Sequence, residues 1–165
     1  MDFNEIGALD IRVQCAGFVY GLSIAEQYIK TGVFSNILLI GAEVQSTAMN
    51  LTNDGRDTAV IFGDGAGAVM LEPSKDGLGI QDSILKSDGS GREFLHMKAG
   101  GSAKPASHKT VDNKEHFIFQ DGQPVFKAAV KNMADVSEEI MKKNNLSADD
   151  VAWLVPHQAN KRIID

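Results

Sequence analysis

The sequence predicts a mixed α/β fold, and the alternation of two kinds of apolar pattern predicts it. Residues 17–30 and 123–144 carry apolar side chains at helical spacing. Residues 36–44 and 151–155 are short, nearly continuous apolar runs, which are typical of strands buried on both faces. Turn residues separate these segments. In such a fold, chemistry gathers where strands end.

Composition sets the limits on function. A chain of 165 residues can form one well-buried domain or a piece of a larger one, and 43% hydrophobic with 23% charged residues is ordinary for a globular protein. The net charge of −6 disfavours broad nucleic-acid binding but leaves room for a local basic patch that docks an acidic partner. No apolar run is long enough to span a bilayer and no leader is evident, so we expect a cytoplasmic protein without a membrane role.

The only cysteine, Cys15, lies in the segment DIRVQCAGFVYGL. Residues 9–13 form a β-like approach, Ala16 and Gly17 supply a small-residue turn, and an amphipathic helix follows and ends near Gly32. A thiol between a strand and a helix lies near unpaired N–H groups and the positive end of the helix dipole, which favours the thiolate. Cys15 is therefore a candidate nucleophile. The alternative is a small buried hydrophobe.

After the polar loop 45–57, residues 58–71 are expected to form two β-rich halves around GDGAG. Asp64 stands between glycines. It could act as a catalytic acid, but we favour a structural role in which its carboxylate accepts hydrogen bonds from backbone N–H groups. The pattern does not open a helix as GxGxxG does, so a dinucleotide site is not predicted.

The middle of the chain has little apolar periodicity. Residues 80–85 are a candidate for a further strand, and residues 86–122 are expected to be a functional loop region. His96, His108 and His116 lie there without short metal-ligand spacing, so we interpret them as solvated loop histidines and expect no metal site.

The last third contains the clearest helix, predicted over residues 123–144, with Pro124 in its first turn and Lys142 and Lys143 at its end. The predicted strand 151–155 runs into PHQAN and presents His157 at its end. A hydrogen-bonded structural histidine is an equal alternative to a catalytic one.

Three motifs in this order, QCAGFVYGL, FGDGAGAVML and LVPHQANKRI, resemble the β-ketoacyl-ACP synthase III family of thiolase-fold condensing enzymes. The resemblance implies a thiolase-like αβαβα layered fold, here incomplete. It implies the end of a first half over residues 1–86, a connection over 87–122 and the start of a second half over 123–165. The interior-like start of the chain agrees with an internal fragment.

The resemblance also implies the activity: condensation of a short acyl-CoA primer with malonyl-ACP through an acyl-cysteine, which starts type II fatty-acid synthesis. CoA thioester is then a substrate and no cofactor is bound permanently. Acyl carrier protein is the partner, and a homodimer is expected. The implied site consists of the nucleophile Cys15, the decarboxylation residue His157, the CoA contacts Arg56 and Asn160, the acyl-pocket residue Phe62, and the carrier-docking residues Lys161 and Arg162.

This sequence departs from the family pattern in two respects. It has NDGRDT around Arg56 where TDRGT or TDRST is more usual, and it lacks the downstream asparagine motif and the glycine-rich oxyanion segment. We therefore expect these 165 residues alone to be poorly stable and inactive, with apolar surfaces exposed. A starter synthase of polyketide metabolism and a non-catalytic fragment that only binds carrier protein remain alternatives.

Overall fold

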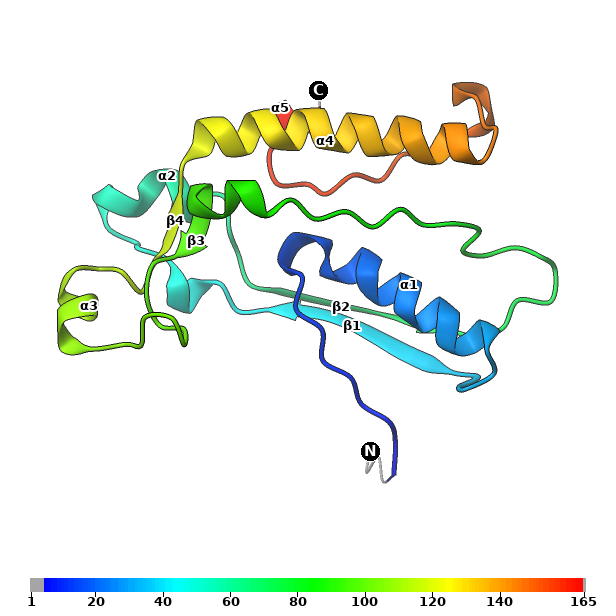
Figure 1. Ribbon diagram of the computed structural model, residues 1–165, viewed down its shortest axis with the longest axis horizontal. Coiled ribbons are helices and arrows are strands. Elements are labelled where there is room, and N and C mark those ends of the chain that lie inside the picture. Colours follow the sequence, from blue (N-terminus) through cyan, green and yellow to red (C-terminus); the bar gives the residue numbers. More distant parts are fainter. Residues whose placement is uncertain (1–4, 165) are drawn as a thin grey trace. The chain divides into compact units, whose positions relative to one another are not determined.

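The computed structural model describes residues 5–164 as a mixture of helices and strands, as the sequence predicts (Figure 1). The chain divides into two compact units. The first comprises Met1–Gly41 and Ala66–Leu85, and the second comprises Ala42–Gly65 and Lys86–Asp165. None of the described helices is both long and apolar enough to cross a membrane.

The first unit is built on one helix and a pair of strands. Helix α1 (Gly17–Lys30) confirms the predicted amphipathic helix, and it ends before Gly32, whose φ of 74° suits glycine. Strand β1 (Ile37–Glu43) confirms the predicted strand and pairs with β2 (Gly65–Leu71). Burial on both faces is wrong, because burial alternates along β1 and Ile40 is 58% exposed.

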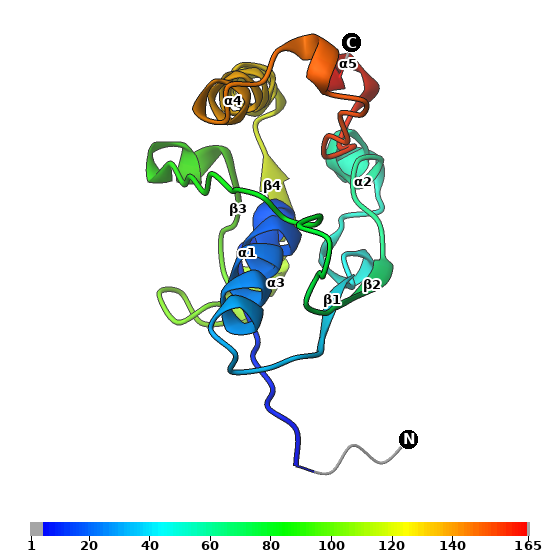
Figure 2. The same ribbon diagram turned by 90° about the vertical axis from the view of Figure 1, so that its right-hand side faces the viewer.

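Helix α1 lies along the β1–β2 pair (Figures 1 and 2). A Cβ placed on Gly21 would lie 2.6 Å from Leu39 Cδ1 of β1, so this glycine permits the close approach of helix and strand. One turn further along the helix, Ala25 is only 3% exposed. Small residues at positions 21 and 25 therefore form the contact face of α1.

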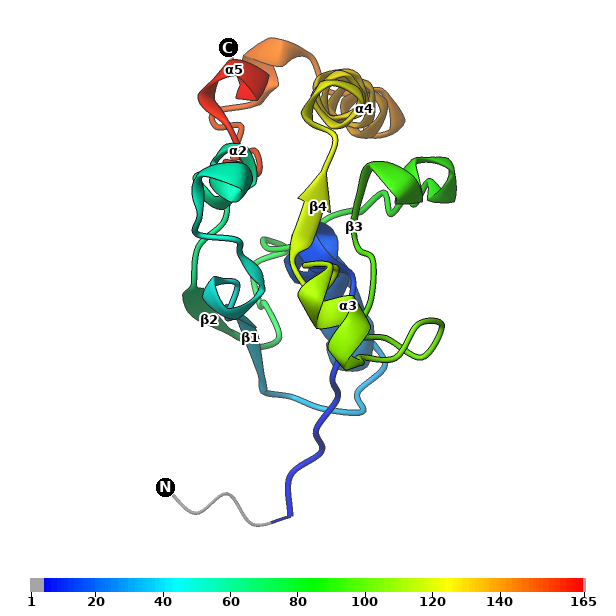
Figure 3. The same ribbon diagram turned by 90° about the vertical axis from the view of Figure 1, so that its left-hand side faces the viewer.

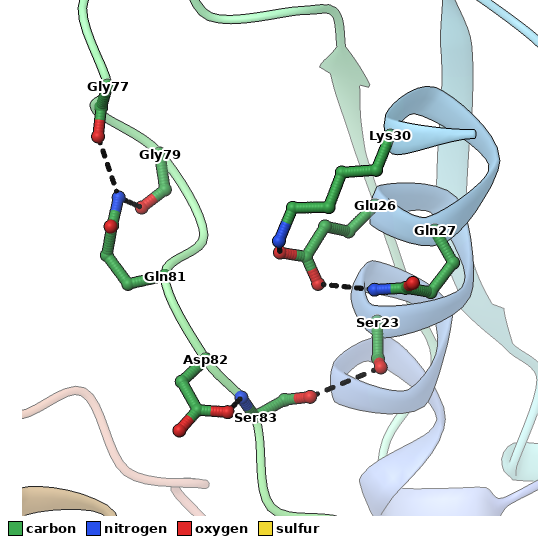
Figure 4. Close-up of polar contacts among 9 residues, drawn as sticks. All are labelled: Ser23, Glu26, Gln27, Lys30, Gly77, Gly79, Gln81, Asp82 and Ser83. Atoms are coloured by element: carbon green, nitrogen blue, oxygen red, sulfur yellow. Dashed lines mark hydrogen bonds and ion pairs between the residues drawn. The ribbon is translucent and has the colours of Figure 1, made fainter. Parts of the chain in front are cut away.

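The segment after β2 contains no strand, so the predicted strand over residues 80–85 is wrong. Its polar groups bond locally or to α1: the Gln81 amide donates to the Gly77 and Gly79 carbonyls, and Ser83 Oγ lies 3.2 Å from Ser23 Oγ of α1 (Figure 4). On the same helix, Lys30 Nζ lies 2.6 Å from a carboxylate oxygen of the mostly buried Glu26. The segment after β2 is therefore an irregular polar stretch that contacts α1 and is not part of the sheet.

The second unit contains several helices and one short antiparallel pair of strands (Figure 3). In this pair, His96 lies opposite Phe119. Its helices and strands are α2 (Arg56–Ala59), β3 (Leu95–Met97), α3 (His108–Asp112), β4 (Ile118–Gln120), α4 (Gly122–Lys143) and α5 (Lys161–Ile164), and its 3-10 turns are Ser46–Ala48, Asn53–Gly55, Gly89–Phe94 and Ala148–Asp150. Residues 86–122 are thus not only loop, because β3, α3 and β4 form within them.

Helix α4 confirms the predicted helix over residues 123–144. It ends at Lys143, and the side chain of the following Asn144 donates to the Ile140 carbonyl. Lys86 forms an ion pair with Glu139 on this helix.

Three other predicted strand segments are wrong. Residues 9–13 are irregular, residues 58–62 lie in α2 and the turn after it, and residues 151–155 form no strand. The last segment is also not buried: Trp153, Leu154 and Val155 are 86%, 69% and 84% exposed. A strand needs a second strand to pair with, and no strand among residues 5–164 pairs with residues 9–13 or 151–155.

Exposed apolar surface is a general feature of the described residues. Ala25 and Ala99 are their only buried apolar residues, and no large side chain among them is fully buried. The expectation that apolar surfaces are exposed is confirmed.

Candidate active site

Cys15 lies in a 3-10 turn, Gln14–Ala16, that leads directly into α1. Its thiol is free and exposed, so the alternative of a buried structural cysteine is wrong for this structure. The preceding residue, Gln14, has a φ of 45°, a backbone conformation that residues other than glycine seldom adopt. A strained turn thus presents the sulfur at the N-terminal end of a helix, where the helix dipole stabilises negative charge.

Asp64 has the structural role that we favoured for it. Its Oδ1 accepts hydrogen bonds from the backbone N–H groups of Gln45 and Ser46 at 2.6 and 2.8 Å, and its Oδ2 accepts one from Ser46 Oγ at 2.7 Å. These bonds, first that from the Ser46 amide and then that from its hydroxyl, hold the pKa of the Asp64 carboxyl below its ordinary value. Asp64 is therefore an ionised acceptor and not an acid poised to give up a proton.

Arg56 begins α2, after a loop that is closed by its own side chains. Asn50 Oδ1 accepts hydrogen bonds from the Thr52 amide at 3.1 Å and the Thr52 hydroxyl at 2.7 Å. A Cβ on Gly55 would lie 2.0 Å from the Asn50 carbonyl oxygen, so only glycine fits beside that backbone. The Arg56 side chain is exposed, and Phe62 is half-buried in the turn before Asp64.

A nonlocal ion pair also holds the Arg56 loop. Lys114 Nζ lies 3.0 Å from Asp54 Oδ2. The pair joins this loop to the segment between α3 and β4.

His157 is exposed in the irregular segment between α4 and α5. Three residues further on, Asn160 Oδ1 accepts a hydrogen bond from the Arg162 amide at 3.0 Å, so its side chain caps the short helix α5. Lys161 and Arg162 lie in α5 and are exposed. Figures 2 and 3 show α2 and α5 on one side of the second unit and α4 on the other.

The predicted site residues divide between the two units. Cys15 belongs to the first unit, whereas Arg56, Phe62, His157, Asn160, Lys161 and Arg162 belong to the second. Within the second unit, Arg56 is on a helix that contacts β4, and Lys161 and Arg162 are on a helix that contacts α4.

Two of the three central histidines are less solvated than predicted. His96 and His116 are half-buried, and His96 packs edge-on against Phe119 with a centroid distance of 5.6 Å. His108, at the start of α3, is exposed. Residues 5–164 contain no group of three or more His, Cys, Asp or Glu side chains arranged to hold a metal ion.

Comparisons with known proteins connect these features to a family. The model of the 3-oxoacyl-[acyl-carrier-protein] synthase III family matches residues 9–89. The β-ketoacyl-[acyl-carrier-protein] synthase III of Chlorobium chlorochromatii is 54% identical over 160 residues, which are 96% of this chain and 48% of the relative. Over nearly its whole length, the chain is therefore similar to one half of the 3-oxoacyl-[acyl-carrier-protein] synthase III proteins. It spans about half the length of the curated relatives it matches.

Solved structures of synthase III proteins confirm that the chain has part of a thiolase-like fold. A crystal structure of a 3-oxoacyl-(acyl-carrier-protein) synthase III matches 95% of this chain with a TM-score of 0.88 at 25% identity, and the match covers 49% of that protein. The synthase III of Aquifex aeolicus matches 91% of the chain with a TM-score of 0.75 at 38% identity and is covered over 43% of its length. The described elements are therefore those of a partial thiolase-like fold.

Sequence reasoning missed the residues that build the Arg56 loop. Asn50, Gly55 and Lys114 contribute no chemistry of their own, but they set the path of the chain into Arg56. The NDG turn signal pointed to a bend. Nothing in the sequence pointed to its partner Lys114, which is 60 residues away.

Proposed function

We propose that the full-length protein that contains this chain is a β-ketoacyl-ACP synthase III, which condenses a short acyl-CoA primer with malonyl-ACP to give 3-oxoacyl-ACP and CO₂. The observation that carries the proposal is the exposed Cys15 at the N-terminal end of α1, within the region that the family model matches. Relatives named as synthase III support it. The reaction would start type II fatty-acid synthesis.

In the first half-reaction, the Cys15 thiolate attacks the thioester carbonyl of acyl-CoA. The tetrahedral intermediate collapses, the bond to the CoA sulfur breaks, and CoA leaves as its thiol after taking up a proton. The product is an acyl group on Cys15. The exposure of the Cys15 thiol supports this step because the acyl-CoA must reach the sulfur.

In the second half-reaction, malonyl-ACP loses CO₂ and the electron pair of the broken C–C bond forms an enolate. The enolate oxygen needs preorganised donors, and we assign an N–H group of His157 to that role. The enolate carbon then attacks the acyl-Cys15 carbonyl and expels the thiolate. His157 acts here as a hydrogen-bond donor and not as the base that activates the cysteine.

The remaining assignments concern binding. Arg56 packs against the CoA adenine, Asn160 contacts the pantetheine arm, and Phe62 lines the acyl pocket. Exposed Lys161 and Arg162 on α5 attract the acidic carrier protein. We further propose a cytoplasmic homodimer, and two thiolase-like halves joined by residues 87–122.

The test separates the two half-reactions in the full-length protein. Radiolabelled acetyl-CoA should label the wild-type protein and leave Cys15→Ser unlabelled, while His157→Ala should still be labelled but should not condense with malonyl-ACP. Undiminished labelling of Cys15→Ser would refute the role of the cysteine. Competition between acyl-CoA primers of different length then separates a fatty-acid enzyme from a starter synthase of polyketide metabolism.

A further inference from the structure

The Asp64 carboxylate joins two segments that are far apart in the sequence. Its three hydrogen bonds reach back 18 and 19 residues, to Ser46 and Gln45. The turn Ser46–Ala48 has no side-chain cap from its own N-terminal residue. Asp64 therefore supplies from a distance the acceptor that a local capping residue would supply, and hydrogen bonds to a charged acceptor are among the stronger ones.

After Ser46 the chain continues to Arg56 through a loop that has several contacts of its own. Asn50 bonds Thr52, the backbone of residue 55 lies against Asn50, and Lys114 pairs with Asp54. These contacts lie along the path of the chain from Ser46 to the start of α2. At the Asp64 end of these hydrogen bonds, Phe62 lies two residues before Asp64 in the chain.

We propose that Asp64 is a positioning residue for the acyl-CoA substrate: its hydrogen bonds to Gln45 and Ser46 keep the Arg56 loop and the Phe62 turn in one fixed arrangement. The inference rests on the proposed function, which assigns the CoA adenine to Arg56 and the acyl group to Phe62. Asp64 touches no reacting atom. Its removal loosens the hold on acyl-CoA and leaves the chemistry at Cys15 and the use of malonyl-ACP unchanged.

The experiment compares graded variants in the full-length protein. Asp64→Ala removes every acceptor and should raise the KM for acetyl-CoA and the Kd for CoA by about tenfold, with kcat and the KM for malonyl-ACP within about twofold of wild type. Asp64→Asn keeps one acceptor oxygen for the amides and should recover most of the affinity. Ser46→Ala loses only the hydroxyl bond and should have the smallest effect.

Asp88→Ala is the matched control. Asp88 also accepts a backbone hydrogen bond, from Ser90 at 2.9 Å, but this bond closes only a local turn. The Asp88→Ala variant should therefore have the wild-type KM for acetyl-CoA and the wild-type Kd for CoA. If Asp64→Ala does not fold, Asp64→Asn and Ser46→Ala carry the comparison.

Direct binding of CoA, measured by calorimetry, keeps this inference separate from the proposed function. A wild-type protein that binds CoA but is not labelled at Cys15 would overturn the proposed function alone. Equal CoA affinity in wild type, Asp64→Ala and Ser46→Ala would overturn the inference, as would a uniform fall in kcat with unchanged KM. A wild-type protein that binds no CoA would overturn both.

Discussion

Cys15 and His157 stand in contrasting surroundings. Cys15 precedes a helix that packs, through Gly21 and Ala25, close against β1. His157 follows five residues that form no strand, three of which expose most of their apolar surface. Close to His157, Asn160 forms a local side-chain cap on α5.

The difference follows from where the backbone hydrogen bonds of each segment are formed, within the segment or with a remote one. A helix forms its backbone hydrogen bonds internally, so α1 can position Cys15 with only one face packed. A strand depends on a partner that is remote in the sequence. The cysteine is therefore held by structure that residues 5–41 largely complete, and the histidine is not.

The largest effect is expected from His157→Ala, which should lower the condensation rate of the full-length protein about 100- to 1000-fold, the usual cost of losing one oxyanion donor. Acylation of Cys15 should continue at the wild-type rate. Steady-state condensation and single-turnover acylation measure the two steps. Loss of acylation in this variant would show that His157 is also needed for the reaction of Cys15 with acyl-CoA. The two residues would then not act in separate steps.

Gly21→Val tests the packing under the nucleophile helix. The new side chain enters the space of Leu39, so the free energy of unfolding should fall by about 1–3 kcal/mol. Gly17→Val, in the same helix but with nothing within 4 Å of its Cβ position, should cost no more than about 0.5 kcal/mol. Denaturant titration gives both values. Equal costs would mean that the helix–strand contact contributes little.

A smaller effect is expected from Asn160, where two roles can be separated. Asn160→Asp keeps an oxygen to cap α5, whereas Asn160→Ala removes it. If the amide contacts pantetheine, both variants should raise the KM for acyl-CoA several-fold, and only Asn160→Ala should speed hydrogen exchange at the Arg162 amide. A wild-type KM in Asn160→Asp would leave the residue with its capping role alone.

The smallest effect concerns the hydrogen bonds that the Asp64 carboxylate accepts from Gln45 and Ser46. Because the pKa of Asp64 is lowered in the folded protein, its contribution to stability is present above the unfolded pKa of about 3.9 and is lost as the pH falls through the folded value. The stability difference between wild type and Asp64→Asn should therefore be constant near neutral pH and shrink below about pH 4. Urea titrations across this range measure it. A difference that grew with acid would contradict the account.

The sequence predicted the two long helices, whose backbone hydrogen bonds are local, and it also located one strand. The periodicity of residues 17–30 and 123–144 placed α1 and α4 within a few residues, and the apolar run 36–44 located β1. The strands expected at 9–13, 80–85 and 151–155 did not form, because an apolar run does not specify its pairing partner.

The site was predictable to a similar extent. The glycines around Asp64 indicated a carboxylate that accepts hydrogen bonds from backbone N–H groups, and this is present. The motif around Cys15 indicated a thiol at the start of a helix, and the thiol lies there and is exposed. The supports of the Arg56 loop could not be predicted, since Lys114 reaches Asp54 across 60 residues and the contact of Gly55 with Asn50 depends on the path of the loop. The site roles of all the predicted residues stay predictions: Cys15, Arg56, Phe62, His157, Asn160, Lys161 and Arg162.

The most direct test of the central claim is a mass measurement on the full-length protein after brief exposure to acetyl-CoA without malonyl-ACP. We predict that the peptide containing Cys15 gains the mass of one acetyl group, and that later addition of malonyl-ACP removes it as 3-oxoacyl-ACP forms. An unmodified Cys15 peptide together with 3-oxoacyl-ACP formation would contradict the covalent mechanism proposed for this protein.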